Sequence, residues 1–107
     1  MITKICTDID QSKKLARILP LESADMYYWC GDGEDLRIDG HRAMDKDLDI
    51  PCWSLAALLY VLPSSTLDSS NDRHYRLHCM ERFSEWYDNP IDVYYEMIIK
   101  LHEQKLL

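Results

Sequence analysis

The most regular hydrophobic pattern of the chain begins at residue 90 and continues toward its C-terminal end. Apolar and aromatic side chains recur there at helical spacing and form one stripe: Ile91, Tyr94, Tyr95, Ile98 and Leu101. Asn89 is a favoured N-cap, Pro90 suits the first helical position, and Asp92 complements the positive end of the helix dipole. This pattern predicts an amphipathic helix that starts at Pro90 and packs its stripe on a sheet.

A second helix is predicted over residues 8–19, because leucine and isoleucine recur on one face and lysine and arginine lie on the other. Thr7, Asp8 or Asp10 can act as its N-cap, since each has a side-chain oxygen that accepts a hydrogen bond from a free amide. Pro20 ends this helix, because its ring cannot continue the helical backbone.

A third helix is predicted between Pro51 and Pro63, beginning at Cys52 or Ser54 and ending at Leu62. Its sequence is apolar nearly all round. A helix of that kind has no face that favours water, so we expect it to be the most buried of the three.

The remaining ordered segments have the aromatic content or the alternation of polar and apolar residues that is typical of strands. We expect strands over five ranges: 26–30, 36–39, 66–67, 74–79 and 83–87. The connections between them are too short for crossovers, so the strands should be antiparallel. The fold class predicted is α+β, a single domain over residues 1–107 with three helices on one face of a small antiparallel sheet built from hairpins.

The negative net charge of the chain limits the classes of molecule that it can bind. The net charge is −7, and residues 31–50 hold seven carboxylates against three cationic side chains. Proteins that bind phosphates need clustered lysine and arginine, so we expect no direct binding to nucleic acid or to an anionic membrane. The longest apolar run, residues 55–62, is far short of a membrane span, and the first residues contain no secretory signal. We therefore expect a cytoplasmic protein, with the acidic segment Gly31–Asp49 as a solvated loop.

A cysteine and two histidines are the candidates for catalysis. Cys52 lies at the predicted start of the middle helix, where the helix dipole lowers the pKa of a thiol. A strand with His74 and His78 follows, which is the order of nucleophile and base in papain-like and related cell-wall peptidase folds. No orienting partner or oxyanion-hole motif accompanies them. The alternative is a buried, inert thiol that packs beside Trp53.

The same two histidines are the candidates for a metal site. His74 and His78 stand four residues apart on a predicted strand, so they share a face, and Cys79 follows directly. Cys79 points to the opposite face, however, and no second ligand pair has the spacing of a zinc site. We therefore expect two solvated strand histidines, no metal and no cofactor. The four cysteines contain no Cys-x-x-Cys pair and are expected to be reduced.

Three segments of the chain carry a resemblance to other proteins: 10–28, 51–59 and 88–103. They resemble a group of short, uncharacterised proteins that phages and mobile elements of gut bacteria encode. No activity and no site residues come with this group. The resemblance implies only a context, namely a cytoplasmic accessory protein of a phage or mobile element.

Three functions from different classes follow as hypotheses. The leading one is a non-enzymatic protein that acts by binding another protein, because no catalytic set is evident and the chain holds three tryptophans and seven tyrosines. Any of these rings left exposed would mark a protein-binding patch. The alternatives are a small cysteine hydrolase with Cys52 as nucleophile and His74 or His78 as base, and an acidic inhibitor of a nucleic-acid-binding enzyme.

Overall fold

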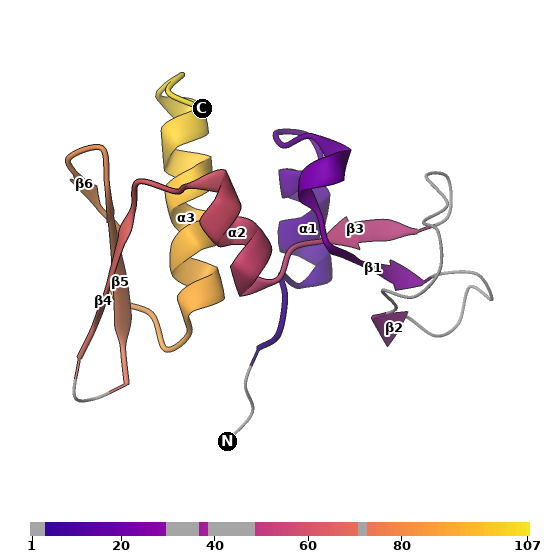
Figure 1. The fold of residues 1–107 in the computed structure, drawn as a ribbon, viewed down its shortest axis with the longest axis horizontal. Helices are drawn as coiled ribbons and strands as arrows, with labels where there is room; N and C mark the ends of the chain where they lie inside the picture. The colour runs from indigo at the N-terminus through magenta and orange to yellow at the C-terminus, as the bar shows by residue number, and fades with distance from the viewer. Residues whose placement is uncertain (1–3, 30–36, 39–48, 71–72) are drawn as a thin grey trace.

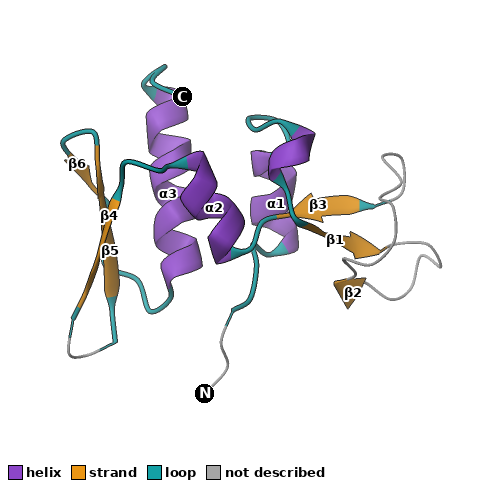
Figure 2. Ribbon diagram, in the orientation of Figure 1, coloured by secondary structure: helices purple, strands orange, loops and turns teal. Residues whose placement is uncertain are grey.

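The computed structural model describes residues 4–29, 37–38, 49–70 and 73–107. Within these residues, three α-helices lie between two three-stranded antiparallel sheets (Figure 1), and Figure 2 shows the same layers by type of secondary structure. The α+β class is confirmed. The helices do not cover one face of a single sheet, as the sequence predicted, because the strands divide into two sheets on opposite sides of the helices.

The first sheet has the strand order β2–β1–β3. Its central strand β1 (Met26–Trp29) pairs with β2 (Arg37–Ile38) on one side and with β3 (Ile50–Cys52) on the other. The pairing of β1 with β2 confirms the hairpin predicted from the sequence. Of the acidic segment Gly31–Asp49 that was predicted to be a loop, residues 31–36 and 39–48 lie outside the described residues.

The second sheet has the strand order β4–β5–β6, built from β4 (Thr66–Ser69), β5 (Tyr75–Cys79) and β6 (Arg82–Phe83). The alternation predicted for β5 is confirmed, since Leu77 and Cys79 are buried while Arg76 and His78 are half-buried. Successive side chains of a strand point to opposite faces. One face of β5 therefore packs on the helices, and the other faces away from them.

The C-terminal helix α3 (Pro90–Glu103) forms as its sequence signals predict. The Asn89 side chain accepts a hydrogen bond from the Asp92 amide at 2.9 Å, and Pro90 occupies the first turn. The helix buries one face in the core: Ile91, Val93, Tyr94, Met97, Ile98 and Leu101. It packs against β5 on one side and against α2 on another.

Helix α1 (Ile9–Leu15) is shorter than the predicted range of 8–19. Asp8 is its N-cap, in a reciprocal capping box with Gln11. At the other end, the amides of Arg17 and Ile18 bond to carbonyls three residues earlier, and this tighter turn ends the α-helix before Pro20. The short 3₁₀ helix η1 (Leu21–Ser23) follows.

Helix α2 (Leu55–Val61) begins after Ser54, whose side chain accepts a hydrogen bond from the Ala57 amide. Cys52 does not belong to this helix but to β3, a strand that the sequence did not predict. The prediction that α2 is the most buried helix is wrong, because Tyr60 is 87% exposed. A helix of seven residues packs on α3 and η1 and leaves its outer side in water.

One hydrophobic core connects the three helices with the second sheet. It contains residues of α1, α2, β5 and α3 together with Trp53: Leu15, Trp53, Leu58, Leu77, Val93, Tyr94, Met97 and Ile98. Since the two ends of the chain contribute to one core, the described residues form one α+β domain. None of their helices combines the length and the apolar character that a membrane span requires.

Candidate functional site

The structure places the predicted nucleophile in β3, an edge strand of the first sheet, with its side chain buried. Cys52 is 0% exposed and pairs in register with Met26 of β1. Burial, together with the neighbouring Cys6 thiol, raises the pKa of Cys52 far above its usual range. A thiol in this environment stays protonated at neutral pH, and the protonated form is a poor nucleophile.

The predicted bases lie elsewhere. His74 directly precedes β5 and His78 is part of it, whereas Cys52 lies in β3, and Figure 1 shows these two strands in different sheets with the helices between them. A catalytic thiol and its base must come within hydrogen-bond reach of one another. The structure does not bring these residues together. The cause is the unpredicted strand, which moves Cys52 from a helix end into a sheet.

The metal hypothesis has no geometric support in the described part of the chain. No three histidine, cysteine, aspartate or glutamate side chains within it lie close enough together to hold a metal ion. His78 contacts an aromatic ring instead, since its imidazole stacks on Phe83 with the ring centroids 4.4 Å apart and the planes 10° from parallel.

This stacked pair belongs to a larger group on the side of the second sheet that faces away from the helices. We call this surface the outer face and define it by four side chains: Arg76, His78, Phe83 and Trp86. The guanidinium carbon of Arg76 lies 4.5 Å from the centroid of the Phe83 ring and 4.8 Å from that of Trp86. Four flat groups are therefore in contact, two from β5, one from β6 and one from the segment that follows it.

Backbone contacts fix the position of Trp86. Tyr87 exchanges two backbone hydrogen bonds with Tyr75, at 2.7 and 2.9 Å. Nearer to β6, the Ser84 hydroxyl accepts a bond from the Leu77 amide, and the Ser84 amide donates to the Leu77 carbonyl, both at 2.9 Å. Residues 84–87 are thus held alongside β5. The strand predicted over 83–87 is in fact β6 at Arg82–Phe83 followed by this tethered segment.

The tight turn between β5 and β6 completes the geometry. Met80 and Glu81 adopt left-handed backbone angles, with φ of 52° and 65°, which are uncommon for residues other than glycine. The turn places Phe83 directly opposite His78 in the sheet register. Cross-strand neighbours on one face are close enough to interact, which accounts for the stacked rings.

The outer face is aromatic and partly apolar, and its charge is largely balanced. Phe83 is 50% exposed and Trp86 is 44% exposed, although both rings are large. The Arg76 guanidinium lies 3.5 Å from the carboxylate of Asp68 on the adjacent strand β4. Such a surface can contact an apolar surface of another molecule. It is poorly suited to bind phosphates, because the Arg76 guanidinium is already paired with Asp68.

Comparison with known proteins does not identify the chain. No protein family, no curated protein and no solved structure matches the chain. The function must therefore be argued from the described residues themselves.

Proposed function

We propose that this chain is a non-enzymatic protein-interaction protein, and that it binds another protein through the outer face. The observation that supports this most is the exposure of Trp86 and Phe83 on a folded, pre-arranged surface. Tryptophan and arginine are enriched among the residues that dominate binding energy at protein interfaces. Here one of each lies in direct contact, beside two further rings.

Rigidity is the second argument. A flexible side chain loses about 0.5–1.5 kcal/mol of conformational freedom when an interface immobilises it. The rings of His78 and Phe83 are already stacked, and Arg76 is already placed between Phe83 and Trp86. Much of that ordering is complete before a partner arrives, so a partner that covers these rings gains more of the contact energy.

Charge favours a protein over a nucleic acid as the partner. Aromatic rings on a sheet can also stack with nucleobases, but such sites use cationic side chains to hold the backbone phosphates. The net charge of the chain is −7, and Arg76 is paired with Asp68. Electrostatic repulsion at long range therefore opposes an approaching nucleic acid. The approach of an uncharged aromatic surface of a protein is largely unaffected by this repulsion.

The context that the resemblance implies belongs to the same proposal. A cytoplasmic accessory protein of a phage or mobile element would act by binding a host protein or another product of the element. The two alternatives have weaker support. The hydrolase would need Cys52 and a histidine to meet, and the acidic inhibitor hypothesis concerns residues 31–49, most of which lie outside the described part of the chain.

A comparative capture experiment tests the proposal. Wild-type protein and the variant Trp86→Ala are immobilised and exposed to a lysate of the cells that encode the chain. The variant Ile5→Ser, which alters an exposed apolar side chain elsewhere, is the matched control. We expect wild type and Ile5→Ser to retain the same protein and Trp86→Ala to lose it. Retention by all three baits, or by none, contradicts the proposal.

A further inference from the structure

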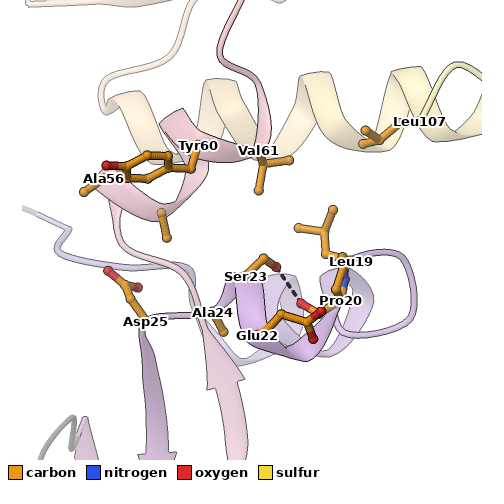
Figure 3. A pocket seen from close by; sticks show the side chains of 11 residues that line it. Leu19, Pro20, Glu22, Ser23, Ala24, Asp25, Ala56, Tyr60, Val61 and Leu107 are labelled. Atoms are coloured by element: carbon orange, nitrogen blue, oxygen red, sulfur yellow. Dashed lines mark hydrogen bonds between the residues drawn. The ribbon is translucent and has the colours of Figure 1, made fainter.

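A separate cavity lies between η1 and α2, away from the outer face. Its volume is about 540 Å³, within the range of about 300–1,000 Å³ that is usual for ligand sites. Figure 3 shows η1 forming one wall and α2 the opposite wall, with Leu107 at one end. We call this cavity the groove.

Hydrogen bonds fix the two walls of the groove relative to one another. The Asp25 carboxylate accepts a hydrogen bond from the Ser54 amide at 3.0 Å and a second from the Ser54 hydroxyl. The indole N–H of Trp53 donates to the Ser23 hydroxyl at 2.9 Å. These contacts fix η1 against the start of α2. The small side chains of Ala56 and Ala57 then leave space that a larger residue would fill.

The floor of the groove is apolar and its charged groups are all acidic. Leu19, Ala57 and Val61 contribute aliphatic surface. Glu22 and Asp25 supply the only charged side chains among the lining residues, and lysine, arginine and histidine do not occur there. In Figure 3 Asp25 and Tyr60 lie on opposite walls at the same end of the groove, away from Leu107, and the Tyr60 ring is 87% exposed. An apolar floor with an acidic rim is complementary to an apolar ligand that carries positive charge.

We propose that the groove binds a basic amphipathic segment of a partner protein. An aliphatic side chain of that segment fills the floor beside Val61. A neighbouring lysine or arginine lies next to Glu22 or Asp25, and the exposed Tyr60 ring offers it a cation–π contact. Short helices that present apolar anchors at helical spacing commonly bind in grooves of this type.

Two other occupants fit less well. A second copy of the chain carries the same net charge of −7, so long-range repulsion opposes self-association at this acidic site. A nucleic acid or another polyanion would place its charges against Glu22 and Asp25. The proposal is independent of the outer face, since none of its four side chains lines the groove.

The test uses a fluorescein-labelled synthetic helical peptide with leucines at helical spacing on one face and lysines on the other. One comparison peptide has glutamate in place of lysine, and another has serine in place of leucine. Fluorescence anisotropy then gives the Kd of each for the full chain. We expect the lysine–leucine peptide to bind, with weaker binding at high salt, and we expect both comparison peptides to bind at least about tenfold more weakly.

Variants locate the binding to the groove. Ala56→Phe fills the space in the groove. This variant should raise the Kd of the lysine–leucine peptide by at least about tenfold. Glu22→Gln removes one charge from the rim of the groove and should raise the Kd of the same peptide about threefold. Glu81→Gln removes the same charge from the turn between β5 and β6, and Trp86→Ala alters the outer face. Neither should change the Kd by more than about twofold.

Three results would overturn this inference. They are equal binding of the lysine and glutamate peptides, an unchanged Kd in Ala56→Phe, and no binding below about 1 mM. If circular dichroism shows that Ala56→Phe is unfolded, Tyr60→Ala replaces it, because its ring is too exposed to be needed for folding. That variant should weaken binding about threefold, and no change contradicts the inference.

Discussion

Two tryptophans of this chain have opposite surroundings. Trp53 is 0% exposed and donates its indole N–H to Ser23. Its carbonyl accepts a hydrogen bond from the Thr7 amide, and its amide donates to the Thr7 hydroxyl. Trp86 is 44% exposed and contacts the Arg76 guanidinium with its ring. The first connects the N-terminal segment, η1 and the core, whereas the second lies on an outer sheet surface. The residue type is the same, and the position in the fold separates a structural role for Trp53 from the binding role that we propose for Trp86.

The largest loss of stability is expected when the buried Trp53 ring is removed. Trp53→Ala should lower the free energy of unfolding by about 3–5 kcal/mol, because it leaves a large cavity in the core and removes the hydrogen bond from the indole to the Ser23 hydroxyl. Urea unfolding followed by circular dichroism measures this. A loss below about 1 kcal/mol would mean that Trp53 is not part of the core, and the comparison between the two rings would fail.

The next effect concerns the packing of α3, which forms the centre of the same core. Ile98 is fully buried there, between the sheet and the other helices. Ile98→Ala should reduce the free energy of unfolding by about 2–4 kcal/mol through the cavity it creates. If the measured loss is under about half a kcal/mol, the apolar stripe of α3 is exposed, and the core is not where the structure places it.

A smaller, pH-dependent effect is expected at Asp92, which connects the N-terminal segment to α3. Its carboxylate accepts bonds from the Lys4 ammonium and the Gln11 amide, both at 2.8 Å. Burial alone would raise the pKa of Asp92, but hydrogen bonds from Lys4, Gln11 and Asn89 outweigh it, and the pKa is lowered. Because the pKa of Asp92 is lower in the folded chain than in the unfolded chain, the ionised carboxylate stabilises the fold at pH values above the unfolded pKa. That contribution is lost as the pH falls through the lower, folded value.

Asp92→Asn should therefore cost about 1 kcal/mol at neutral pH and little at a pH below the folded pKa of the wild-type residue. Urea unfolding of both proteins across this pH range measures the difference. Asp10→Asn, which changes an exposed carboxylate in the first turn of α1, is the control. A difference that stays constant with pH would show that Asp92 acts through its shape and not through its charge.

The smallest change in stability is expected at the exposed ring. Trp86→Ala removes a cation–π contact at a partly exposed site, and such contacts contribute about 0.5–1 kcal/mol. The free energy of unfolding should therefore fall by no more than about 1 kcal/mol. A fall as large as that of Trp53→Ala would make Trp86 a structural residue as well, and the proposed binding role would lose its basis.

Local signals in the sequence predicted much of this fold. The cap at Asn89, the proline after it and the apolar stripe together define α3, because all three act within one element. The alternation in β5 similarly predicted which of its side chains face water. The strand β3 was missed, since its pairing with β1 is a long-range contact and Pro51 and Cys52 resemble a helix entrance in isolation.

The candidate site was only partly predictable for the same reason. Sequence reasoning placed Arg76 and His78 on the wet face of a strand and stated that an exposed tryptophan would mark a binding patch. It did not identify Trp86, because the ring reaches Arg76 only through the turn at Met80 and the bonds that hold Ser84 and Tyr87 to β5. The groove between η1 and α2 has no local signature at all.

The most direct test of the central claim is a titration of the captured partner against purified wild-type protein and Trp86→Ala by isothermal calorimetry. If the outer face is the binding surface, the variant keeps its fold and loses at least about 2 kcal/mol of binding free energy, which is about thirtyfold in Kd. Equal affinity of the two proteins for the partner would contradict the account.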